Sequence, residues 1–133
     1  MQANILMDFL VLEKKLYGKL TEVTELTRQL AEAVDRQDPV SVRLLISMRQ
    51  EPIYSLQEIQ ANLELSQIGL ADAARIGALL EGEDAATEEE QPLADQVATN
   101  RHLLERLLTL DRQVSLKLGG EDSAYQRRQK KGI

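Results

Sequence analysis

Apolar residues recur every three or four positions over most of this chain, which is typical of helices that bury one face. The clearest run falls within residues 92–118. Its seam consists of Leu93, Val97, Asn100, Leu104, Leu107, Asp111, Val114 and Leu118. The steps alternate between four and three, and only Asn100 and Asp111 are polar. This spacing predicts a long helix that packs along one stripe against another helix.

A second long helix is predicted from about residue 4 to residue 35. Its apolar positions are Phe9, Leu12, Leu16, Leu20, Val23, Leu26, Leu30 and Val34. An acidic turn over residues 35–38 follows. Asp38 is suited to cap the next helix, and Pro39 fits a first helical position, where the missing N–H is not needed. Because the connection is so short, the next helix should run antiparallel to the first.

The helix that begins at Pro39 keeps a seven-residue apolar pattern to about Ser66, although Arg49 and Pro52 occupy two of its seam positions. A proline inside a helix removes one backbone hydrogen bond and clashes with an earlier carbonyl. No cluster of Gly, Asn and Ser surrounds Pro52. We therefore favour a continuous helix bent near Pro52 over a complete break. A short helix over about residues 73–80 should follow.

Two segments of unbalanced charge complete the chain. Residues 81–91 are rich in Glu and Asp and contain no basic residue, which predicts a solvated acidic loop. Gly119 and Gly120 should end the last helix and leave residues 121–133 as a mobile basic tail. The predicted fold is therefore all-α: residues 1–120 form an elongated antiparallel bundle of three main helices plus one short helix.

Composition narrows the function classes. A net charge of −6 argues against nucleic-acid binding, because the phosphate backbone requires a basic surface. The apolar run at residues 5–12 is too short to span a membrane, and no basic residue precedes it as in a secretory signal. A cytoplasmic protein is expected. His102 is the only histidine, cysteine is absent, and no nucleotide-binding or nucleophile motif is present. We expect neither an enzyme nor a bound metal or cofactor.

The polar seam residues have two interpretations each. Asn100 and Asp111 either fix helix register or contact a partner, or they lie at the bundle edge and reach water. The edge position is favoured for Asn100, whereas the two interpretations of Asp111 are balanced. Arg49 offers the same choice, and its guanidinium is able to meet Asp111 across the bundle.

Leucines outside the seam indicate a surface that a partner covers. Leu103, Leu107, Leu110 and Val114 form a stripe rotated from the main seam, and we predict that it contacts a protein partner. Tyr125 is the best candidate for an anchor in the basic tail. The alternative is a structural coiled-coil module whose exposed seam mediates self-association, for example as a homodimer.

Several segments resemble the small flagellar type III export chaperones, which bind filament-cap or hook–filament junction subunits. They are the long first helix, the acidic turn 35–38, the run 44–50, the segment 107–111 and the pair Ala124-Tyr125. The resemblance implies a cytosolic, non-enzymatic chaperone that holds an amphipathic helical segment of a late flagellar subunit. The stop at Gly119-Gly120 departs from relatives that carry a further helix.

Overall fold

The protein is described from a computed structural model, which gives the backbone of residues 3–131 and the side chains of residues 3–119. Four helices and no strand are present in this part of the chain. They are α1 (Ala3–Asp35), α2 (Pro39–Leu65), α3 (Ala73–Leu80) and α4 (Gln91–Lys131). The all-α prediction of three long helices and one short helix is confirmed.

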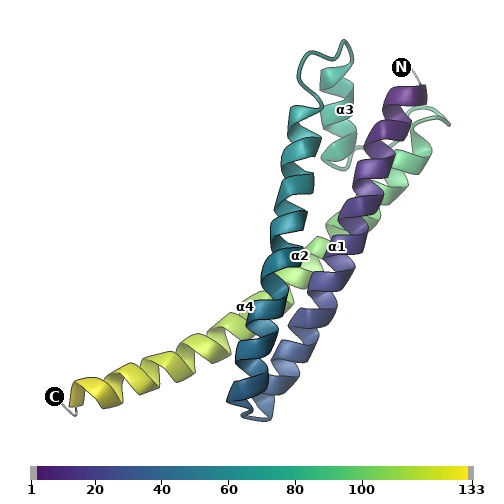
Figure 1. Ribbon diagram of the computed structural model, residues 1–133. Coiled ribbons are helices and arrows are strands. Elements are labelled where there is room, and N and C mark those ends of the chain that lie inside the picture. Colours follow the sequence, from purple (N-terminus) through teal and green to yellow (C-terminus); the bar gives the residue numbers. More distant parts are fainter. Residues whose placement is uncertain (1–2, 132–133) are drawn as a thin grey trace.

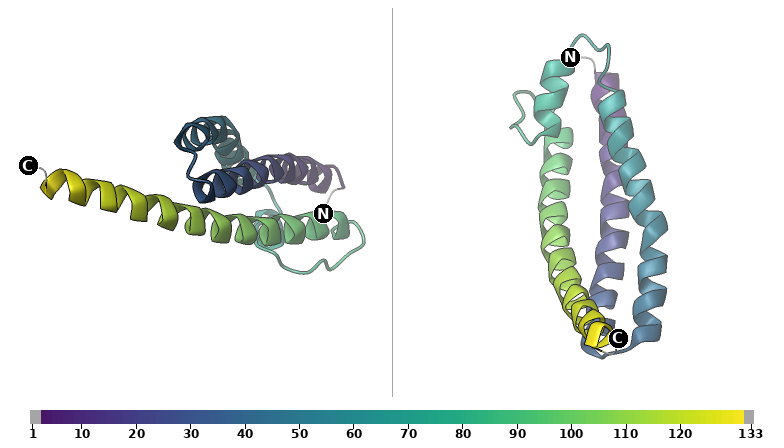
Figure 2. Two further views of the ribbon diagram at one scale, coloured as in Figure 1. Left: turned by 90° about the horizontal axis from the view of Figure 1, so that it is seen from below. Right: turned by 90° about the vertical axis from the view of Figure 1, so that its left-hand side faces the viewer.

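Helix α1 is the central element of an elongated bundle. It packs along α2 on one side and along α4 on the other, and Figure 2 shows it between them. In contrast, no Cα atom of α2 comes within 8 Å of a Cα atom of α4. Helix α3 packs on α4 at the end of the bundle that holds the N-terminus (Figure 1). The bundle is therefore open between α2 and α4, except where side chains bridge them.

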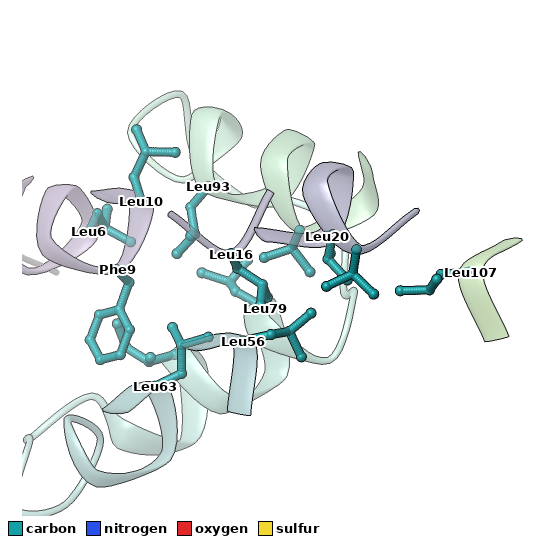
Figure 3. Packing of buried hydrophobic residues seen from close by; sticks show 13 residues of the cluster. Leu6, Phe9, Leu10, Leu16, Leu20, Leu56, Leu63, Leu79, Leu93 and Leu107 are labelled. Atoms are coloured by element: carbon teal, nitrogen blue, oxygen red, sulfur yellow. The ribbon is translucent and has the colours of Figure 1, made fainter. Parts of the chain in front are cut away.

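The larger core cluster joins all four helices. Figure 3 shows leucines from each helix meeting around Leu16 and Leu79. Ile76 and Leu79 of α3 are completely buried, which explains how a helix of 8 residues holds its place. Burying side chains of this size contributes about 2 kcal/mol each relative to exposure. Helix α3 is thus fixed by burial of its apolar face.

A smaller core cluster lies near the turn between α1 and α2. It is built from Leu30, Ala33, Val34, Leu45 and Val114. The turn itself forms a Schellman motif, since Asp38 N–H donates to Ala33 O and Gln37 N–H donates to Val34 O, both at 3.0 Å. Gln37 adopts the left-handed conformation that this motif needs, with φ at 57°. The Asp38 carboxylate accepts hydrogen bonds from Ser41 and caps α2 as predicted.

Helix α2 is continuous across Pro52, as predicted, and Pro52 itself is buried. The helix is visibly curved in Figure 2. A buried proline ring packs as an apolar side chain, and this offsets part of the cost of the missing hydrogen bond. Pro52 therefore keeps its place in the apolar seam without dividing the helix.

The prediction that Gly119 and Gly120 end the last helix is wrong, because α4 continues to Lys131. Its C-terminal part extends beyond α1 and α2 (Figure 1). Each glycine costs only about 1 kcal/mol relative to alanine, and the following Ala, Gln, Arg and Lys residues are strong helix formers. Local propensity therefore outweighs the two glycines. The predicted mobility of residues 121–133 stays a prediction, and residues 132–133 lie outside the described part.

Candidate partner-binding groove

The predicted partner stripe on α4 is only partly accessible. Leu107 and Val114 are 6% and 2% exposed and belong to the larger and smaller core clusters. Leu103 is half-buried against the larger cluster, and Leu110 is half-buried beside a shallow surface depression. A partner can reach Leu107 and Val114 only if the helices separate. The Tyr125 side chain lies outside the described residues, so its role as an anchor stays a prediction.

The leucines expected outside the seam divide into two groups. Leu108 and Leu116 are exposed on α4, whereas Leu103 and Leu110 are half-covered by the bundle. The bundle thus covers part of the leucine surface and leaves the rest to solvent.

A groove of about 400 Å³ lies where α2 and α4 diverge above α1. Leu16 and Leu20 of α1 contribute to it, together with Leu63 of α2 and Leu80 at the end of α3. Its full lining also includes Glu13, Gln60, Glu64, Gln67, Val97, Asn100, Arg101 and Leu104. The groove therefore combines apolar walls with a few polar groups, which is the usual character of a binding site.

The most unusual group in this groove is Glu13. It is only 4% exposed, and Asn100, which is 3% exposed, approaches it from α4. The Asn100 Nδ2 group donates to Glu13 Oε2 at 2.6 Å and to Glu13 backbone O at 2.7 Å. Burial raises the pKa of the Glu13 carboxyl, while the hydrogen bond from Asn100 and the charge of Arg101 oppose the rise. The groove thus contains a buried carboxylate.

The expectation that Asn100 lies at the bundle edge is wrong. Asn100 is buried because it satisfies two acceptors of α1, and Gln96 Nε2 in turn donates to Asn100 Oδ1 at 3.1 Å. A buried amide is stable only with such partners. Asn100 therefore fixes the register between α1 and α4.

The second polar contact between helices is the pair Arg49–Asp111. Arg49 Nη2 lies 2.6 Å from Asp111 Oδ1, which confirms the meeting of these two residues across the bundle. The Arg49 side chain is 13% exposed and that of Asp111 is 40% exposed. The pair connects α2 and α4 between the two core clusters, where their backbones stay apart.

The acidic loop is more ordered than its composition indicates. Most of its acidic residues are exposed as predicted, but Glu90 is 5% exposed. Arg75 of α3 donates to both Glu90 carboxylate oxygens, at 3.0 and 2.7 Å, and it also contacts Glu83. Hydrogen bonds from Arg75 and from the Ala86 backbone N–H lower the pKa of Glu90 to about 2. The basic partner of this loop lies outside it in sequence, and for this reason composition alone missed it.

The described residues offer few other candidates for a catalytic or metal-binding site. His102 is exposed. Within residues 3–119, no group of three or more His, Cys, Asp or Glu side chains is arranged to hold a metal ion. None of the helices in the described part of the chain is long and apolar enough to cross a membrane.

Sequence reasoning missed Glu13 and Thr27, although a signal for both was present. Alternate steps of three and four along α1 run through Leu6, Phe9, Glu13, Leu16, Leu20, Val23, Thr27, Leu30 and Val34. Every member of this series is buried. The predicted seam used Leu12 and Leu26 instead, because they are apolar, and both are only half-buried. The strict alternation of three- and four-residue steps therefore predicts the buried positions of α1 better than the choice of apolar residues does.

Comparison with known proteins identifies no relative of this chain: no protein-family model, no curated protein and no solved structure matches it.

Proposed function

We propose that this protein is a non-enzymatic binding protein that holds an amphipathic helical segment of another protein. The observation that carries the proposal is the opening between α2 and α4, with its groove of about 400 Å³. Both helices pack on α1 and neither covers the other. A helix of suitable shape would contact α2 and α4 together, in the helix-in-groove mode of recognition.

The resemblance to flagellar type III export chaperones supplies the partner class. In this proposal the bound segment belongs to a late flagellar structural subunit, and the protein keeps it in the cytoplasm until export. The acidic, leucine-rich composition agrees with that class. Leu103 and Leu110 are the half-buried residues of the predicted stripe and do not line the groove, so in this proposal they contact a part of the segment that lies outside it.

The test is a binding measurement with a purified filament-cap or hook–filament junction subunit. We expect a 1:1 complex in size-exclusion chromatography with light scattering, weakened by Leu103→Ala and Leu110→Ala together. Leu116→Ala, at an exposed position farther along α4, is the matched control and should leave affinity unchanged. No complex with either subunit would refute the flagellar assignment. A lowered melting temperature with unchanged affinity would place Leu103 and Leu110 in the core instead.

Self-association is the second candidate, and exposed apolar residues on α2 favour it. Val40, Leu44 and Met48 are 68%, 59% and 48% exposed and follow one another at steps of four, so they form a stripe on one helix face. Such a stripe is suited to an antiparallel contact between two copies. Light scattering across a concentration series distinguishes the candidates, since self-association predicts a stable homo-oligomer without any added subunit.

A further inference from the structure

The groove contains an acidic group whose hydrogen-bonding capacity is only partly used. Glu13 Oε2 accepts from Asn100, but Glu13 Oε1 accepts no hydrogen bond from any of the described side chains or backbone groups. No Lys or Arg of residues 3–119 lies within ion-pair distance of this carboxylate. A buried carboxylate without a cation is costly, so a cation placed beside it would be strongly favoured.

Arg101 acts on Glu13 through its charge but forms no ion pair with it. Arg101 lines the groove, yet its side chain lies over the loop after α3, where a Cβ atom on Gly82 would be 3.2 Å from Arg101 Cδ and Nε. Gly82 has a φ of 104°, a conformation that glycine adopts easily. The missing side chain at residue 82 thus leaves room for Arg101 beside the loop, and Glu13 stays without an ion-pair partner.

The walls around Glu13 suit a long side chain with a charged end. Leu16, Leu20 and Leu104 provide apolar surface in the groove, and Glu64 adds a second carboxylate on the α2 side. Lys and Arg bury their methylene stems against apolar surface and carry the charge at the tip. A volume of about 400 Å³ is sufficient for one such side chain.

We propose that the groove receives a Lys or Arg side chain from the bound helix, whose cationic group pairs with Glu13. This inference rests on the proposed function and specifies the partner's chemistry. The partner segment is an amphipathic helix with one basic residue in the middle of its apolar stripe. Apolar residues on either side of that position contact α2 and α4, and the basic residue selects the register.

The test uses the full-length protein and two fluorescently labelled helical peptides of Ala, Leu and Gln. One peptide has a single Lys at the centre of its apolar stripe, and the other has Gln there. Fluorescence anisotropy should show the Lys peptide binding roughly tenfold more tightly, as expected for a hydrogen bond to a buried charge. A third peptide with Arg at this position should also bind more tightly than the Gln peptide.

Variants of the protein test which groove residue causes the tighter binding of the Lys peptide. Glu13→Gln should bind both peptides equally, because its amide still accepts from Asn100 but carries no charge. Glu64→Gln is the matched control in the same groove, and its exposed carboxylate should contribute little to the Lys preference. Circular dichroism of Glu13→Gln checks that the bundle is retained. If this variant does not fold, Glu64→Gln decides between the two carboxylates, because loss of the Lys preference in that variant would contradict the role of Glu13.

The outcomes separate the two proposals. Equal binding of the Lys and Gln peptides overturns the cation site and leaves helix binding intact. Failure of all peptides to bind, at concentrations where unlabelled flagellar subunits also fail, overturns the proposed function itself. A Lys preference that survives Glu13→Gln but disappears in Glu64→Gln would assign the charge selection to the groove rim and contradict the role of Glu13.

Discussion

The two polar contacts between helices differ in how their charge is balanced. Arg49 and Asp111 neutralise one another, and Asp111 keeps 40% of its side chain in contact with solvent. Glu13 is only 4% exposed and accepts a hydrogen bond from a neutral amide rather than from a cation. The first contact connects two helices that would otherwise stay apart, whereas the second places a carboxyl group without an ion-pair partner inside the bundle. Stability explains the first arrangement, but it does not explain why an acid occupies position 13.

The largest difference should appear when Asn100 is replaced by Ala. The substitution removes both hydrogen bonds from Asn100 to Glu13 and leaves the buried carboxylate without a hydrogen-bond partner. We expect a loss of about 3 kcal/mol in the free energy of unfolding at neutral pH, measured by urea denaturation. The control is Gln96→Ala, which removes only a hydrogen bond to Asn100 and should cost about 0.5–1 kcal/mol. Equal losses for the two variants would contradict the central position of Asn100.

A smaller effect, of opposite sign, is expected for Glu13→Gln. Burial raises the pKa of Glu13 in the folded state, so the folded protein resists ionisation of this group. The protonated form carries no penalty at low pH. Stability should therefore fall as pH rises from the ordinary pKa of glutamate through the raised folded-state pKa. Glu13→Gln removes this loss and should unfold at a higher temperature than the unmodified protein at pH 7.

The higher melting temperature of Glu13→Gln should disappear in acid, below the ordinary pKa of glutamate. Glu13 is then protonated in both the folded and the unfolded state of the unmodified protein. Melting temperatures across a pH series measure this directly. Glu90 titrates in the opposite sense, since its folded-state pKa is lowered to about 2 and its contribution is lost as pH falls toward that value. The pKa values of Glu25 and Asp38 are lowered as well, so Glu13→Gln is compared with the unmodified protein at each pH, where the titrations that the two proteins share cancel. A constant difference at all pH values would show that the pKa of Glu13 is the same in the folded and unfolded states.

A coupling of about 1 kcal/mol is expected between Arg49 and Asp111. The estimate is modest because Asp111 is partly solvated. A double-mutant cycle of Arg49→Met and Asp111→Asn measures the coupling free of other losses. This cycle is needed because Arg49 Nε is buried without a hydrogen-bond partner among the described atoms, so removing Arg49 also removes an unfavourable term. No coupling would mean that the pair does not connect α2 and α4 in solution.

The smallest expected effect is a difference between the two contacts in how strongly their free energies respond to salt. Raising the ionic strength to about 1 M should reduce the Arg49–Asp111 coupling by a few tenths of a kcal/mol, because screening acts on partly exposed charges. The cost of Asn100→Ala should change much less, since the Glu13 side chain is only 4% exposed. A similar salt response at both contacts would indicate that solvent reaches Glu13.

The sequence predicted much of the fold because helical spacing is a local property. Asp38 and Pro39 marked the start of α2, and the seam of α4 correctly named Leu93, Val97, Leu107 and Val114 as buried. The end of α4 was missed because glycine is a weak helix breaker when strong helix formers follow it. Glu13 was missed for a different reason: its burial depends on Asn100, which is 87 positions away in sequence. The pair Arg49–Asp111 was identified because both residues interrupt apolar seams.

The length of α4 would convert a small tilt of the helix into a large displacement of its end. From Asn100 to Lys131 the helix advances about 45 Å at 1.5 Å per residue. If a side chain entering beside Glu13 tilts α4 by about 10° around Asn100, the far end of a rigid helix of this length moves by about 8 Å. A slight displacement in the groove would thus become a large displacement at the opposite end of the molecule. Distance measurements between spin labels on α2 and near the end of α4 would detect it.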